Sequence, residues 1–123
     1  MWVERNNNPL HVRTGDCAVR AISILLDISW EQAYAMLASV GFSKGVLMNM
    51  DSVWGAILKD NGFKQYFPEC EDCITIKEFC EQHPKGTYAI KADDHVVAVI
   101  DGKYIDAWNS GDEYVIYYWQ KEE

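Results

Sequence analysis

The residue with the clearest capacity for chemistry is a cysteine at the predicted start of a helix. Cys17 lies within residues 14–22, which read Thr-Gly-Asp-Cys-Ala-Val-Arg-Ala-Ile. Gly15 allows a sharp turn, and Asp16 is a favoured N-cap residue whose carboxylate can accept a hydrogen bond from a first-turn amide. A thiol on the first helical turn has a lowered pKa and lies beside free N–H groups that can stabilise an oxyanion. The alternative is that Cys17 is a small core residue, because free cysteines are often buried.

A catalytic thiol also needs a base and a group that orients the base. The best candidate for the base is His95, at the start of a predicted strand, and the neighbouring carboxylates of Asp93 and Asp94 could raise its pKa. The orienting group should come from the next strand, where Asp106 and Asn109 are the candidates.

A hairpin within residues 100–103 decides between these two candidates. If its Asp-Gly pair forms a two-residue turn, His95 and Asp106 lie on the same side of the sheet as Trp108, with Asn109 on the other side. Asp106 is then diagonal to His95, at a backbone separation of about 7–8 Å that two side chains can close. We therefore predict Asp106 as the orienting residue. A three-residue loop or a bulge would bring Asn109 opposite His95 instead.

These residues must be positioned by helices that precede a sheet. Helices are predicted near residues 16–26, 30–39, 51–60 and 75–82, and strands near 63–67, 87–92, 95–100, 103–108 and 113–119. Capping boxes begin at Ser29 and Thr75, and Gly41 is expected to end the second helix. Residues 1–13 are expected to be irregular. The layout predicts one α+β domain over residues 1–123, with N-terminal helices packed on a mostly antiparallel sheet.

The order of a helix-borne cysteine, a strand-borne histidine and an acidic or amide residue on the next strand resembles that of papain-like cysteine peptidases. Residues 15–21 and 94–106 look like segments of small papain-like proteins of bacteria and their phages. The overall plan is similar to the bacteriocin-leader (double-glycine) peptidases, over about residues 8–119. The resemblance implies a papain-like fold with Cys17 as nucleophile, and it implies no substrate. The Asp-x-x-Cys spacing of ovarian-tumour deubiquitinases is absent, so only the Cys-x-x-Arg-Ala portion is similar to that family.

The resemblance also raises the question of the oxyanion hole. Papain-like enzymes usually carry a glutamine about six residues before the cysteine, and His11 stands at that position here. Asn8 is the other candidate, because its amide is the right kind of donor, although an ordinary Asn-Pro turn explains it equally well. The backbone N–H of Cys17 would serve in either case.

The other cysteines raise the possibility of a metal site. Cys70, Cys73, Cys80 and His83 are zinc-ligand types in order along the chain. Their spacing is cramped, because the last two would lie on a capped helix only a few residues after Cys73. We therefore expect no metal and no cofactor, with Cys80 in the core. Arg20 could pair with Asp16 or another carboxylate, but an exposed charge is the favoured interpretation.

Composition limits the partners. The chain has 123 residues, 49% of them hydrophobic, and a net charge of −8. This acidity argues against binding to nucleic acid and to anionic membranes. No signal-peptide core or membrane-spanning run is present, so we expect a cytoplasmic protein with reduced thiols.

These patterns together predict a thiol hydrolase, most simply a cysteine peptidase acting on a peptide or isopeptide bond. Cys17 would attack the carbonyl, His95 would transfer the proton, Asp106 would orient His95, and Asn8 with the Cys17 amide would hold the oxyanion. The alternative is a catalytically silent papain-like interaction module, possibly encoded by a phage. The sequence does not indicate the oligomeric state.

Overall fold

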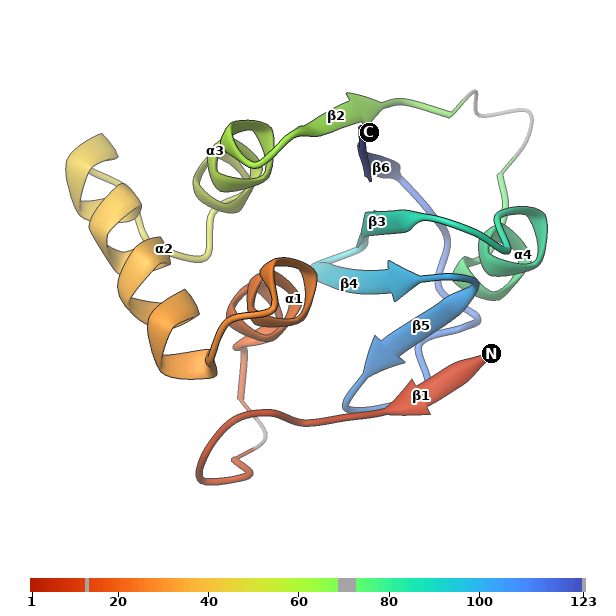
Figure 1. Ribbon diagram of the computed structural model, residues 1–123, viewed down its shortest axis with the longest axis horizontal. Helices are drawn as coiled ribbons and strands as arrows, with labels where there is room; N and C mark the ends of the chain where they lie inside the picture. The colour runs from red at the N-terminus through yellow and green to blue at the C-terminus, as the bar shows by residue number, and fades with distance from the viewer. Residues whose placement is uncertain (13, 69–72, 123) are drawn as a thin grey trace.

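The helices lie on both sides of a mixed sheet. The computed structural model describes residues 1–12, 14–68 and 73–122 (Figure 1). Within these residues the helices are α1 (Cys17–Leu26), α2 (Trp30–Lys44), α3 (Asp51–Asp60) and α4 (Ile76–Gln82). The strands are β1 (Trp2–Glu4), β2 (Phe63–Tyr66), β3 (Thr87–Ala92), β4 (His95–Ile100), β5 (Lys103–Asp106) and β6 (Tyr117–Lys121). This confirms the predicted α+β class. None of the helices in the described ranges has the length and apolar character needed to cross a membrane.

The strands are ordered β1-β5-β4-β3-β6-β2 across the sheet. Every pairing is antiparallel except that of β1 with β5, which is parallel. In the β4–β5 hairpin Ile100 pairs with Lys103 and Val99 with Tyr104. The predicted two-residue turn and its register are therefore confirmed.

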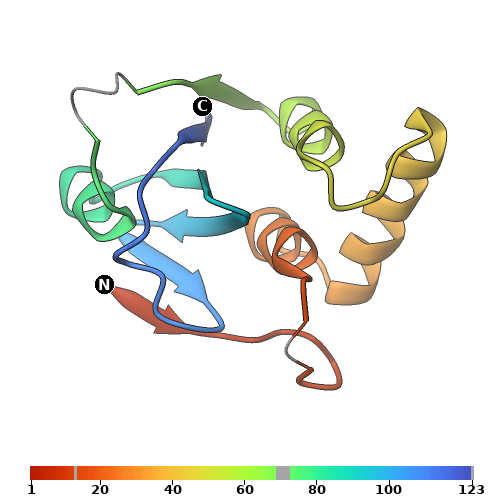
Figure 2. The same cartoon turned by 180° about the vertical axis from the view of Figure 1, so that it is seen from behind.

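Two hydrophobic clusters among the described residues use alternate residues of the sheet. The first cluster joins α1, α2 and α3 to one set of sheet residues, among them Val96 and Ala98 of β4. The second joins α4 to the alternate residues, among them Val97 and Val99. A strand with both faces covered reads as a continuous apolar run, which is why β4 shows no polar alternation. Figures 1 and 2 show β3 and β4 running between α1 and α4.

The second helix is longer than predicted. It continues past Gly41 to Lys44, and Gly45 ends it in the left-handed conformation with φ 71°. Gly41 is buried because the backbone that follows the helix packs on it: a Cβ there would lie 3.0 Å from the Cα of Met48. The absence of a side chain thus serves close packing rather than helix termination.

The ends of the sheet also differ from the prediction. Residues 1–13 are not wholly irregular, since Trp2–Glu4 form β1 beside β5. The last strand begins at Tyr117 rather than at residue 113, because the preceding backbone is bonded to the start of α4. There the amide of Ile76 donates to the carbonyl of Glu113 at 2.9 Å. β5 ends at Asp106, two residues before the predicted end.

Candidate active site

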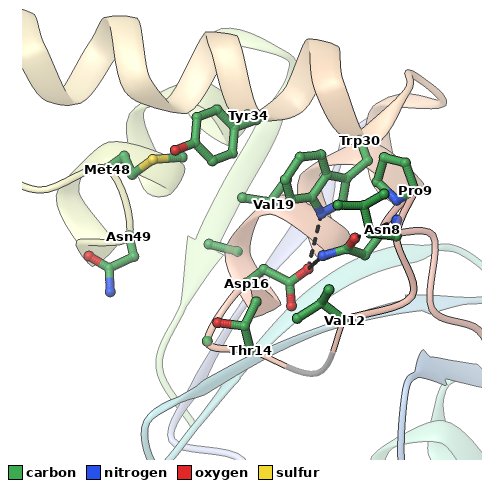
Figure 3. Close-up of a pocket in the computed structure, with 13 residues that line it drawn as sticks. Asn8, Pro9, Val12, Thr14, Asp16, Val19, Trp30, Tyr34, Met48 and Asn49 are labelled. Atoms are coloured by element: carbon green, nitrogen blue, oxygen red, sulfur yellow. Dashed lines mark hydrogen bonds between the residues drawn. The ribbon is translucent and has the colours of Figure 1, made fainter.

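Cys17 is the first residue of α1, as predicted, and Asp16 precedes it at the N-cap position. The carboxylate of Asp16 makes no capping hydrogen bond, so the predicted reason for its place was wrong. It accepts hydrogen bonds from Arg20 Nε at 2.9 Å, from Trp30 Nε1 at 3.0 Å and from Asn8 Nδ2 at 3.2 Å. Figure 3 shows the bonds from Trp30 and Asn8. Burial alone would raise the pKa of Asp16, but these donors and the Arg20 charge lower it.

Arg20 joins α1 to the sheet. Its side chain is buried, and besides Asp16 it contacts Asp106, with 3.0 Å between Nη1 and Oδ1. The favoured expectation of an exposed charge was therefore wrong. The alternative, a carboxylate partner, is confirmed for both Asp16 and Asp106. One guanidinium fixes two buried carboxylates, which a planar fork of donors does well.

Asp106 is bonded directly to the predicted base. Its Oδ2 lies 2.6 Å from His95 Nε2 and accepts a second hydrogen bond from Ser110 Oγ at 2.7 Å. The amide of Ala107 donates to Oδ1 at 2.8 Å. Burial would raise the pKa of Asp106, but His95, Ser110 and Arg20 lower it, so the carboxylate stays charged.

The side chains of His95 and Cys17 are hydrogen-bonded to each other. Burial would lower the pKa of His95, but hydrogen bonds and charges from Asp106 and Cys17 raise it to about 9. Burial would likewise raise the pKa of Cys17, but hydrogen bonds from His95 and the Val96 backbone, with the charges of His95 and Arg20, lower it. Since Nε2 of His95 faces Asp106, Nδ1 is the ring nitrogen left to face the thiol. This geometry favours a thiolate beside an imidazolium.

The predicted influence of Asp93 and Asp94 on His95 was wrong. Both side chains are exposed in the turn between β3 and β4, and the pKa of His95 is raised by Asp106 and Cys17 instead. The indole ring of Trp108 stacks on the imidazole ring of His95. Its ring centroid is 4.6 Å from that of His95, with 26° between the planes, and the Arg20 guanidinium is 5.3 Å from the same indole.

The two oxyanion candidates, Asn8 and His11, lie in different surroundings. Asn8 is buried, its Nδ2 donates to Asp16, and its Oδ1 accepts from the Leu10 amide at 2.9 Å. His11 is exposed at φ 53° and lines a separate hollow with Glu4 and other residues of the N-terminal segment. The structure thus assigns the Asn8 amide to Asp16, and the oxyanion role of Asn8 or His11 stays a prediction.

Asn109, the alternative orienting residue, serves the following loop. Its Oδ1 accepts hydrogen bonds from Tyr104 Oη at 2.7 Å and from the Gly111 amide at 3.1 Å. The structure therefore brings Cys17, His95 and Asp106 together and leaves Asn109 outside the group.

The zinc-ligand types form no group of three where the structure describes them. Cys70 lies outside the described residues, and Cys73 is exposed. Cys80 is buried in the second cluster, as expected, and burial raises its pKa to about 11. His83 stacks on Phe79 with 4.0 Å between ring centroids. Within residues 1–12, 14–68 and 73–122, no group of three or more His, Cys, Asp or Glu side chains is arranged to hold a metal ion.

Sequence reasoning missed two supporting residues. Trp30 reaches Asp16 from the start of α2, and Ser110 reaches Asp106 from the loop after β5. Neither position carries a local signal, because each contact depends on how separate elements pack. Arg20 did carry one: its spacing of four residues from Asp16 places both on one helix face.

Comparison with known proteins finds no matching family model, no matching curated protein and no matching solved structure. The functional argument therefore depends on the geometry of Cys17, His95 and Asp106.

Proposed function

We propose that this protein is a thiol hydrolase of papain-like plan, most simply a cysteine peptidase that cleaves a peptide or isopeptide bond. The observation that carries the proposal is the continuous chain from Cys17 through His95 to Asp106, in which the carboxylate lies 2.6 Å from the imidazole. Nucleophile, base and orienting group come from α1, β4 and β5, which are separate elements.

The reaction follows from the charge states. With its pKa lowered, Cys17 attacks the substrate carbonyl as a thiolate, and the resulting oxyanion can accept a hydrogen bond from the Cys17 amide. His95, protonated because its pKa is raised to about 9, gives its proton to the leaving amine. A water then attacks the acyl-enzyme and returns a proton to His95, which releases the acid and restores the thiolate. Asp106 holds the ring nitrogen and stabilises the imidazolium throughout.

A thiolate nucleophile suits the reducing cytoplasm that the sequence predicts, because thiols stay reduced there. The acidic composition suits a peptide or protein substrate better than nucleic acid. The catalytically silent interaction module is the competing hypothesis, and thiol reactivity together with peptide cleavage separates the two.

The first experiment is brief labelling with sub-stoichiometric iodoacetamide at pH 6, followed by peptide mapping. We expect the label on Cys17, because an ordinary thiol with a pKa of about 8.5 is hardly ionised at that pH. The His95→Gln variant should lose this preference. Preferred labelling of Cys73 or Cys70 would contradict the assignment of Cys17 as nucleophile. Alkylation of Cys17 at the same rate as free N-acetylcysteine would contradict it too.

The second experiment is incubation with a mixed peptide library, with Cys17→Ala as the blank. Cleavage that disappears in the variant supports the peptidase. A reactive Cys17 without any variant-sensitive cleavage would overturn hydrolysis of peptides and favour the interaction module.

A further inference from the structure

A stripe of apolar residues runs along the solvent-facing surface of α2. Phe42 is 91% exposed and Tyr34 is 46% exposed. Ala35 and Ala38 lie between them on the same side of the helix. We propose that this stripe pairs antiparallel with α2 of a second copy of the chain, so that Phe42 of each copy enters a cavity beside Tyr34 of the other. This pairing is independent of the chemistry at Cys17.

The stripe is additional to the side of α2 that packs inside the molecule. The buried residues of α2 are Ala33, Leu37 and Gly41, which follow one another at intervals of one helical turn. Figures 1 and 2 show α2 at one end of the molecule, with α1 and α3 on its inner side. A surface helix normally has one apolar stripe and is polar elsewhere, whereas a helix with more apolar surface than that is usually covered. The second stripe of α2 is therefore expected to have a partner.

The stripe is complementary to itself in an antiparallel arrangement. Tyr34 and Phe42 are equally spaced along α2 on either side of Ala38. With Ala38 on a two-fold axis, Tyr34 of one copy therefore lies level with Phe42 of the other, and the contact occurs twice, as in other isologous interfaces. The small side chains of Ala35 and Ala38 allow the two helices to approach closely at the centre.

A cavity lies beside Tyr34, where Phe42 of the second copy would arrive. The cavity has a volume of about 450 Å³ and is bounded by the segment before α1, the start of α2 and residues 48–49 (Figure 3). Tyr34 lines it together with the half-exposed Val12. An apolar cavity of about 150 Å³ is enough for benzene, so this one has room for a phenyl ring. Transfer of that ring out of water would favour association.

The charges of α2 also suit a second copy in this orientation. The net charge of −8 opposes contact between copies over much of the surface, but α2 carries a single acidic and a single basic residue. These are Glu31 in the first turn and Lys44 in the last, and neither forms an ion pair with another described residue. Antiparallel pairing brings Glu31 of each copy close to Lys44 of the other, whereas parallel pairing would bring like charges together.

The length of α2 predicts a weak dimer. The helix has 15 residues, and at a rise of about 1.5 Å per residue it is about 22 Å long. One pair of such helices is smaller than a standard protein interface of about 1,600 Å². We therefore expect dissociation constants in the micromolar range rather than the nanomolar range.

Sedimentation velocity of the full chain tests the association, from about 1 µM to about 500 µM and with a reductant that excludes disulfide-linked dimers. We expect monomers at the lowest concentration and dimers at the highest. Phe42→Ala should raise the Kd at least about tenfold, because the ring that enters the cavity is lost.

Phe67→Ala is the matched control. Phe67 is also an exposed phenylalanine, but it follows β2 and its ring contacts Tyr117. This variant should leave the Kd within about twofold. Phe42 and Phe67 both lie at the surface, so both variants should fold, and circular dichroism checks this.

Charge variants test the orientation of the two helices. Lys44→Glu and Glu31→Lys should each raise the Kd about fivefold, because each places like charges opposite one another at both ends of the pair. An equimolar mixture of the two variants should restore association, since every facing pair is then of opposite sign. A mixture that associates no better than either variant alone would overturn the antiparallel pairing.

A variant outside α2 tests the cavity. Val12→Arg places a long charged side chain at the cavity without changing the helix, and it should weaken the dimer about as much as Phe42→Ala. An unchanged Kd in Val12→Arg would overturn the cavity as the place that Phe42 occupies. Monomers at every concentration, or equal effects of Phe42→Ala and Phe67→Ala, would overturn self-association through α2 and leave its stripe to a different protein.

Discussion

Cys17 is partly buried and Cys80 is fully buried, and the two thiols have different neighbours. Cys80 lies on α4 in the second cluster, where burial raises its pKa to about 11. Burial acts in the same direction on Cys17, but donors from β4 and the charges of His95 and Arg20 outweigh it and lower the pKa. The difference between the two thiol pKa values is thus decided by the groups that other elements bring close to Cys17, and not by burial.

The histidines of the two regions show the same difference. His83 follows Cys80 closely in sequence, yet its ring packs on Phe79 and its Nδ1 lies 2.9 Å from the Phe79 carbonyl. His95 is far from Cys17 in sequence, yet the fold joins it to the thiol and to Asp106. Proximity along the chain is therefore a poor guide to which cysteine and histidine side chains meet in the fold.

The largest expected effect comes from removing the cation that sets the Cys17 region apart. Arg20→Met should lower the free energy of unfolding by about 3–5 kcal/mol, because it leaves the buried carboxylates of Asp16 and Asp106 without their shared partner. Urea unfolding measures this. The matched control is Lys91→Met, which breaks a more exposed pair with Asp51 and should change the free energy by less than about 1 kcal/mol. Equal losses in the two variants would show that the buried network contributes no special stability.

The next effect is on the thiol itself. Asp106→Asn should lower the rate at which Cys17 is alkylated at pH 6 by about 100-fold, because the imidazolium loses the carboxylate that stabilises it. Asn109→Ala should leave this rate within about twofold, since Asn109 bonds within the following loop. The reverse ranking, in folded protein, would make Asn109 the orienting residue.

A smaller effect is expected in the pH dependence of stability. The raised pKa of His95, about 9 against about 6.5 unfolded, gives stability that is complete below pH 6.5 and lost as pH rises through 9. The lowered pKa of Cys17 acts oppositely, since its contribution is present above the unfolded pKa and lost as pH falls through the folded one. In the wild type the contribution of Cys17 therefore opposes that of His95, and the loss of stability between pH 6.5 and 9 should be smaller than His95 alone would give.

Cys17→Ala removes the contribution of the Cys17 thiol to the pH dependence of stability. Its free energy of unfolding should fall by about 1–2 kcal/mol from pH 6.5 to 9, because Asp106 still raises the pKa of His95. Cys80→Ala is the control and should keep the pH profile of the wild type, whatever its absolute stability. A wild type that declines as steeply as Cys17→Ala would show that Cys17 is not ionised in this range.

The smallest expected effect is that of a chelator. Thermal unfolding with and without 1,10-phenanthroline should agree within about 1 °C, because two hydrophobic clusters form the core and we expect no metal site. A large drop together with one equivalent of bound zinc would mean that the segment from Cys70 to His83 is a metal site after all.

Local chemistry explains the parts of the fold that the sequence predicts well. The Asp-Gly turn determines the β4–β5 register within a few residues, and this correctly favours Asp106 over Asn109 as the partner of His95. The capping boxes at Ser29 and Thr75 are both present, because each is a contact between residues three apart.

The features that were missed depend on distant segments. The burial of Arg20 follows from the arrival of Asp106 from 86 residues further along the chain. Gly41 looks like a helix end by itself, and only the backbone packed on it shows otherwise. Asp16 is a natural N-cap by residue type, but its carboxylate oxygens accept hydrogen bonds from Arg20, Trp30 and Asn8 instead. In each case tertiary contacts override a sound local preference.

The parallel pairing of β1 with β5 has a consequence for the order in which the protein folds. The backbone carbonyl of Asp106 accepts hydrogen bonds from the amide of Arg5, at 2.9 Å, and from the indole Nε1 of Trp2, at 3.2 Å. These contacts close a loop of 104 residues, and long loops are the slowest to close. During synthesis β1 is made long before β5, so it cannot pair until its partner strand exists. The strand that carries Asp106 is therefore secured late in folding, and the hydrogen bond between Asp106 and His95 should form late as well.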